Sequence, residues 1–152
     1  MPISNFISEI LEIKDLIVEN TETTPEEVNI FFKLERRDHV CPVCGAMTNK
    51  VHDYRTSIIK DAPLQGKHTF LHYKKRRYHC SSCNHHFNES FNLLPKHCRI
   101  TNRLSFLAIH LLRENQNVSS VARQTGISAS TIFRRMEDIK YRRDSIHAVR
   151  WC

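Results

Sequence analysis

Four cysteines form two C-x-x-C pairs, Cys41-Cys44 and Cys80-Cys83, with 35 residues between the pairs. Thiolates at this spacing bind zinc, because each short turn brings two sulfurs to one side of the ion and two such turns complete a tetrahedron. We call the segments 41–45 and 80–84 the two zinc knuckles. The spacing predicts one structural Zn²⁺ held by Cys41, Cys44, Cys80 and Cys83.

The start of the chain and its hydropathy bear on the redox state of these thiols. The first residues, 1–6, contain no basic segment, and no apolar run approaches the roughly 20 residues that span a bilayer. We therefore expect a cytoplasmic protein, in which thiols stay reduced. That compartment favours metal ligation over disulfide bonds.

Other side chains near the knuckles could also bind metal. A set of three cysteines and one histidine would leave one knuckle cysteine unused, so we interpret the nearby histidines as surface or core-edge residues. The alternative metal ligands near the knuckles are His39, His79, His85, His86 and Cys98. We interpret Cys98 and Cys152 as free thiols.

The elements that must position the knuckles are strands. Segments 51–59 and 68–78 alternate enough to form two antiparallel strands, with residues 61–67 as the turn, and they return Cys80 to the side of Cys44. This is the pattern of a zinc ribbon. Before it, the spacing predicts a short helix over 5–13 and a hairpin of residues 16–18 and 28–34 around an acidic turn.

Charge is distributed unevenly along the chain. The net charge of +7 combines −5 over residues 1–40 with +12 over residues 41–152. A basic surface of this size attracts the phosphate backbone of nucleic acids. The densest cluster lies on the second ribbon strand, whose alternation places charge on both faces, so we expect no buried core strand there but a strand lying along DNA. This cluster is Lys74, Lys75, Arg76 and Arg77.

Helical periodicity follows the break at Pro95. Thr101 is placed to cap a helix whose apolar residues recur at three- and four-residue spacing between 104 and 112. A short helix at 118–125 ends at Gly126, and Ser128 is placed to cap a third helix. This is the pattern of a helix-turn-helix, with Ile127 and Ile132 packing the third helix on the second.

If the third helix enters the major groove, its first residues meet base edges. Arg134 is the predicted base contact, because arginine can bond guanine O6 and N7 together. Ser130 shares its face, while Ile132 and Met136 are predicted to lie on the opposite, buried face. Phosphate contacts are predicted for Arg123, Ser128, Thr131 and Arg135.

The order of these motifs resembles the N-terminal half of the ISL3-type insertion-sequence transposases. The resemblance covers roughly residues 10–145. It implies an α+β chain divided into a helix and hairpin (1–38), a zinc ribbon (39–95) and a helix-turn-helix domain (96–152). It also implies binding to the terminal inverted repeats of the element, with cutting and joining left to a separate, later RNase-H-like domain.

The acidic residues depart from a complete transposase. After Glu114 the chain has only Glu137, Asp138 and Asp144, too few and too confined to build a two-metal carboxylate site. We therefore expect DNA binding as the recognition part of a transposase and no catalysis, with double-stranded DNA as partner and a homodimer or a full-length transposase as a further partner.

Two alternatives stay open at this stage. The same architecture suits a stand-alone repressor or an adaptor derived from a transposase. A zinc-supported nuclease is the more remote alternative, and it would use residues just after the second knuckle. Those residues are His85, His86, Asn88 and Glu89.

Overall fold

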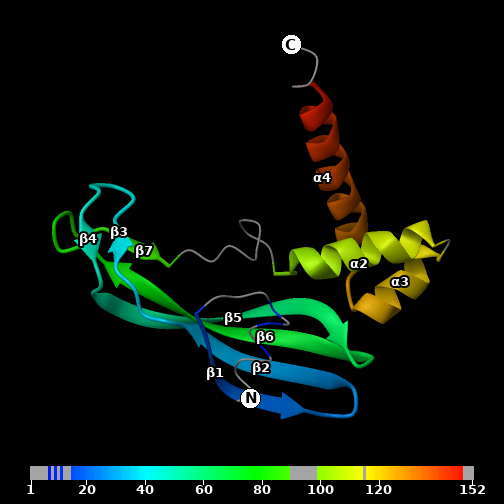
Figure 1. Ribbon diagram of the computed structural model, residues 1–152, viewed down its shortest axis with the longest axis horizontal. Coiled ribbons are helices and arrows are strands. Elements are labelled where there is room, and N and C mark those ends of the chain that lie inside the picture. The colour runs from blue at the N-terminus through cyan, green and yellow to red at the C-terminus, as the bar shows by residue number, and fades with distance from the viewer. Residues whose placement is uncertain are drawn as a thin grey trace.

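The computed structural model describes residues 7, 9, 11, 15–89, 99–114 and 116–148, and beyond residue 138 it describes only the backbone. From residue 16 on, the strands come first and the helices follow (Figure 1). Predictions for Pro95, Cys98 and Cys152 lie outside the described residues. The strands are β1 (Leu16–Thr23), β2 (Glu27–Leu34), β3 (His39–Val40), β4 (Met47–Thr48), β5 (Val51–Leu64), β6 (Lys67–His79) and β7 (His86–Asn88). The helices are α2 (Asn102–Arg113), α3 (Val118–Thr125) and α4 (Ala129–Ala148).

The predicted N-terminal hairpin is present, although its first strand continues through residues 19–23 of the predicted polar turn. Strands β1 and β2 pair in antiparallel fashion, as the two β-branched and aromatic runs around a polar turn indicate. Residues 7, 9 and 11 are helical, and Ile7 and Leu11 are buried in the core of the sheet. The described part of the predicted first helix therefore covers the sheet.

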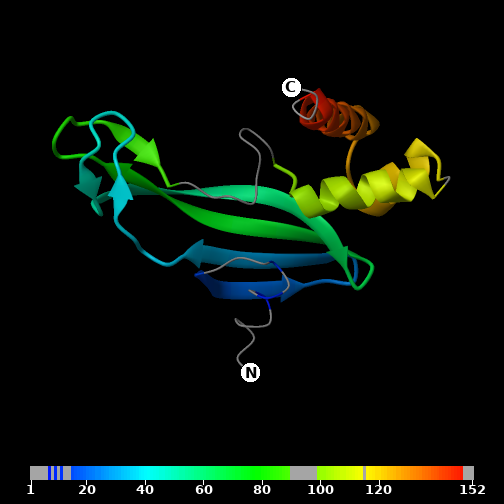
Figure 2. The same ribbon diagram turned by 45° about the horizontal axis from the view of Figure 1, so that its top comes forward.

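A parallel pairing joins this hairpin to the ribbon. Strand β2 pairs with β6 over residues 27–32 and 68–73, and the sheet order is β1-β2-β6-β5. Figure 2 shows these four strands as one twisted layer. Strands β2 and β6, which lie on either side of the predicted boundary at residue 38, are therefore hydrogen-bonded to each other. The sequence patterns did not indicate this pairing.

The β5–β6 hairpin is longer than predicted and its turn is shorter. The strands continue to Leu64 and resume at Lys67, so the turn consists of Gln65 and Gly66 in place of the predicted 61–67. Both turn residues have positive φ, 52° and 74°, which matches a tight turn whose twist suits antiparallel strands.

The prediction that the second ribbon strand cannot be a core strand is wrong. Strand β6 lies between β2 and β5, and Thr69, Leu71 and Tyr73 are buried on one face. Beyond Lys74, which is exposed, the buried side chains are Arg76 and Tyr78 on the other face, where residues 35–39 cover them. The charges are accommodated because the buried face of the strand changes between residues 73 and 76.

The helices have a core of their own, as predicted. Ile127 and Ile132 pack with Leu104 and Val121, and the Thr101 side chain accepts from the Leu104 N–H to cap α2. Ser128 caps α4 by accepting from the Thr131 N–H at 3.3 Å. Gly126 ends α3 in the left-handed conformation with φ 66°. No helix among the described residues is long and apolar enough to span a membrane.

Gly126 offers a test of this turn. A Cβ at Gly126 would lie 3.2 Å from His68 Nδ1 across the contact with β6, whereas a Cβ at Gly66 would meet no atom within 4 Å. Both glycines have positive φ, so alanine costs about 1–2 kcal/mol at each. We expect Gly126→Ala to lower the free energy of unfolding more than Gly66→Ala, measured by denaturant titration. Equal losses would contradict the close contact.

Candidate metal centre and nucleic-acid interface

Each knuckle is a tight turn held by local main-chain hydrogen bonds. The Cys41 N–H donates to Ala46 O at 2.9 Å and the Gly45 N–H to Cys41 O at 3.0 Å, and in the second knuckle the Cys80 N–H donates to His85 O at 2.9 Å. Gly45 and Asn84, the residues directly after the second cysteine of each pair, have positive φ of 73° and 56°. Glycine and asparagine tolerate this conformation, so the sequence supports both turns.

The sulfurs of the four predicted zinc ligands lie close together. Cys41 Sγ lies 3.6 Å from Cys83 Sγ, Cys44 Sγ lies 3.5 Å from Cys80 Sγ, and all four lie within 4.8 Å of one another. Sulfurs at about 2.3 Å from a tetrahedral zinc ion stand about 3.8 Å apart. These separations fit zinc and are far longer than the S–S bond of a disulfide, about 2.0 Å. The knuckles therefore form a four-cysteine zinc site.

The pKa values of the knuckle thiols also favour a bound cation. Hydrogen bonding from the backbone of Cys83 lowers the pKa of Cys80 to about 6, and the backbone of Cys44 likewise lowers the pKa of Cys41. At Cys83 the backbone of His85 acts in the same direction, but burial and the three neighbouring sulfurs raise the pKa to about 12. Four crowded thiols that cannot all ionise alone can do so around a divalent ion.

The described alternative ligands, His39, His79, His85 and His86, do not join the sulfurs. Within the described ranges, the only group of histidine, cysteine and acidic side chains close enough to hold a metal is the four cysteines. His86 instead packs against the rings of His52 and His79. Glu89 is buried beside Arg76 and Tyr73, so it is not available as the carboxylate of the remote nuclease alternative.

The basic strand presents fewer free cations than predicted. Lys74 is exposed, and Lys75 and Arg77 are half-buried. Arg76 is only 5 % exposed and forms an ion pair with Glu89 at 3.2 Å, so its predicted phosphate contact is corrected. Its side chain is buried against the Glu89 carboxylate and the carbonyl oxygen of Glu35.

The start of α4 presents a different face from the one it buries. Ser130 and Arg134 are exposed together, as predicted, while Ile132 is buried in the helical core. Phe133, which the sequence patterns did not single out, is 51 % exposed beside Arg134. The sequence feature that could have indicated the exposure of Phe133 is its position directly between Ile132 and Arg134.

Two predictions for this helix need correction or refinement. Met136 was expected to be buried but is 40 % exposed, because α4 extends away from α2 and α3 beyond its first turns (Figure 1). Arg135 is largely enclosed and pairs with Asp138 at 3.0 Å. Arg123 and Ser128 are exposed, and the Ser128 hydroxyl lies 2.9 Å from that of Thr131.

A groove beside the knuckles was also not foreseen. It has a volume of about 770 Å³, and its lining includes Arg36, Lys50, His52 and Tyr54. The Arg36 guanidinium donates to Asn49 O at 2.7 Å, which ties the segment before the first knuckle to the start of β5. Arg36 and Asp38, from the acidic N-terminal part of the chain, therefore help to line this groove.

Comparisons with known proteins agree with this arrangement. Residues 37–83 match the zinc-finger of transposase IS204/IS1001/IS1096/IS1165, and residues 89–139 match the helix-turn-helix domain of transposase family ISL3. The chain is 30% identical over 106 residues to the transposase for insertion sequence element IS1001 of Bordetella parapertussis.

That alignment covers 70% of this chain and 26% of the relative, so the chain spans about a quarter of that transposase. No solved structure matches the chain. The two matched families follow each other along the chain and coincide with the four-cysteine site and with α2–α4. The chain therefore carries the zinc ribbon and the helix-turn-helix domain of the ISL3-type transposases, in that order.

Proposed function

We propose that this chain is the DNA-recognition part of a transposase and binds the terminal inverted repeats of an insertion element in a sequence-specific manner. The observation that carries the proposal is the exposed face of α4. Ser130 and Arg134 point outward at its start, while Ile127 and Ile132 anchor the same turns in the helical core. A helix held in this way can place its first residues in the major groove.

In this proposal, different surfaces of the protein contact the DNA bases and the DNA backbone. Arg134 reads guanine, and Phe133 is placed to contact a thymine methyl group. Backbone contacts come from the ribbon strand and from the turns around α4, and carry affinity without sequence information. The proposed backbone set is Lys74, Lys75, Arg77, Arg123, Ser128 and Thr131.

Substitutions separate the two roles. We expect Arg134→Ala to relax the base preference at one position and cost about 1–3 kcal/mol on the preferred sequence, because it removes a bidentate contact. The double variant Lys74→Ala, Lys75→Ala should weaken binding to all sequences alike and make the salt dependence less steep by about one unit per lost contact. Binding to matched and scrambled duplexes over a salt series measures both effects, and indistinguishable profiles for the two variants would refute this division.

Selection from a random pool of duplex DNA tests the function itself. Enrichment of one motif that also occurs at the ends of an element supports the proposal, and a palindromic motif would indicate that a homodimer binds. A motif found at promoters would favour the repressor alternative. Recovery of no motif would overturn sequence-specific binding. Stable association with a full-length transposase, tested by co-purification, would add the adaptor role.

A further inference from the structure

The end of β5 attaches the sheet to the helical domain through its main chain. The Lys60 N–H donates to Arg99 O at 2.8 Å, and the Thr101 N–H donates to Lys60 O at 2.9 Å. Lys60 and Ile100 thereby form a parallel β-bridge just before α2. The first residues of the helical domain therefore continue the hydrogen bonding of the sheet.

The Lys60 side chain makes a second attachment at a distant point of the helix-turn-helix. Its Nζ donates to Gly126 O at 2.7 Å, in the turn between α3 and α4. One residue of β5 thus contacts both the entry to α2 and the turn that presents the recognition helix. Two attachments at separate points restrict rotation of the helical domain about the first.

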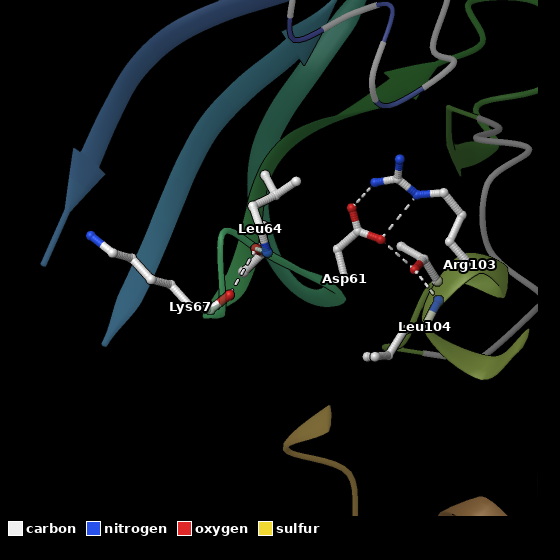
Figure 3. Close-up of polar contacts among 7 residues, drawn as sticks. Asp61, Leu64, Lys67, Arg103 and Leu104 are labelled. Atoms are coloured by element: carbon white, nitrogen blue, oxygen red, sulfur yellow. Dashed lines mark hydrogen bonds and ion pairs between the residues drawn. The ribbon is translucent and has the colours of Figure 1, made fainter. Parts of the chain in front are cut away.

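Asp61 makes the third attachment, and it is buried. Only 2 % of the residue is exposed, and its Oδ1 accepts from the Thr101 hydroxyl at 2.6 Å and from Arg103 Nε at 3.3 Å. Arg103 Nη2 donates to the other carboxylate oxygen, so the guanidinium forms a two-pronged pair (Figure 3). The same Thr101 hydroxyl caps α2, which couples the direction of that helix to the carboxylate. Charge-assisted, bidentate bonds of this kind fix geometry as well as contributing energy.

We propose that Lys60 and Asp61 are positioning residues that hold the ribbon and the recognition helix at one fixed separation, so that the protein binds only DNA whose two contacted segments have a matching spacing. The inference rests on the proposed DNA binding. A flexible linker between two DNA-binding modules tolerates many spacings at reduced effective concentration. Three attachments remove that tolerance and convert spacing into a determinant of specificity.

DNA spacing is the readout, because loss of stability alone would not change it. Footprinting first defines the segments that the ribbon and the helices protect, and duplexes are then made with two or ten base pairs inserted between them. We expect the unaltered chain to lose at least about tenfold in affinity for both duplexes. The whole-turn insertion restores the rotational phase but not the distance, so a rigid protein rejects it too.

Matched lysine variants provide the control. Lys60→Met removes the bond from Nζ to Gly126 O, whereas Lys67→Met removes an equivalent bond from Nζ to Thr24 O at 2.9 Å, which joins the same hairpin to the β1–β2 turn and not to a helix. We expect Lys60→Met and Asp61→Asn to accept the inserted duplexes with a penalty below about threefold, and Lys67→Met to behave like the unaltered chain. Equal spacing tolerance in Lys60→Met and Lys67→Met would overturn the proposal, as would unaltered protein that binds all spacings alike.

A second measurement needs no DNA and separates this inference from the proposed function. Residual dipolar couplings of the free protein should fit one alignment tensor for the sheet and for α2–α4, and two different tensors in the double variant Lys60→Met, Asp61→Asn. Two tensors in the unaltered chain would refute a fixed orientation even if DNA binds. If Asp61→Asn fails to fold, Lys60→Met carries both measurements.

Discussion

Replacing Cys80 by serine is expected to disorder the zinc end of the ribbon while the helical core persists. The knuckles lie at the end of the β5–β6 hairpin opposite to the helices (Figure 1). None of the four cysteines belongs to the sheet core or to the helical core, so the metal replaces packing at that end. Structural zinc contributes about 10–16 kcal/mol of apparent binding free energy in small domains, more than the few contacts there can supply.

Amide hydrogen exchange and circular dichroism measure this effect residue by residue. In Cys80→Ser, or in the unaltered chain with a strong chelator, protection should be lost over residues 39–52 and 77–88 and retained around Leu71 and Leu104, with little change in helical dichroism. Ser82→Ala, in the same knuckle, is the matched control and should behave like the unaltered chain. Collapse of protection throughout the chain would show instead that ribbon and helices fold as a single unit.

Features encoded within a few residues could be predicted from the sequence. The two C-x-x-C turns, the cap at Thr101 and the left-handed Gly126 depend on local backbone geometry, and the structure confirms each of them. The helical core followed from three- and four-residue spacing for the same reason. In each case the residues that determine the structure are neighbours in the chain.

Long-range pairing could not be predicted in this way. The parallel register of β2 with β6 joins segments that are far apart in sequence, and the alternation of each strand is compatible with several partners. The pairing makes β6 a central strand up to Tyr73. Beyond it, Glu35 and Glu89 contact Arg76 and bury it, although the run of four basic residues had indicated exposure. The prediction that Met136 is buried was wrong for a related reason. Helical spacing gives the direction of a side chain but not the point at which the neighbouring helices end.

Glu89 explains how a central strand accommodates that arginine. It follows β7, and its N–H donates to Arg76 O at 3.0 Å, at the edge of β6 that β2 no longer covers. Its carboxylate accepts from the Arg76 N–H at 3.3 Å, from Arg76 Nη1 at 3.2 Å and from the Tyr73 hydroxyl. Burial, together with the bond to Glu89, raises the pKa of Tyr73, which keeps the phenol protonated as a donor.

Arg76→Ala should therefore act on folding and not on DNA contacts. The change leaves the Glu89 carboxylate buried without its cation, which costs about 3–5 kcal/mol for a buried pair broken on one side. Lys74→Ala, two residues away, removes an exposed cation 5.3 Å from the Tyr54 ring and should cost about 1 kcal/mol or less. Denaturant titration measures both values, and equal midpoints for the two variants would contradict the burial of the Arg76–Glu89 pair.

The double variant Arg76→Met, Glu89→Gln distinguishes a lost charge partner from lost packing. Removing both charges eliminates the unpaired carboxylate, so most of the stability lost in Arg76→Ala should return. Among variants that remain folded, Lys74→Ala should lower the slope of DNA affinity against salt by about one, and the double variant should leave that slope unchanged. A salt slope lowered equally in both would place Arg76 on the DNA after all, because only a cation that contacts phosphate releases counterions when it binds.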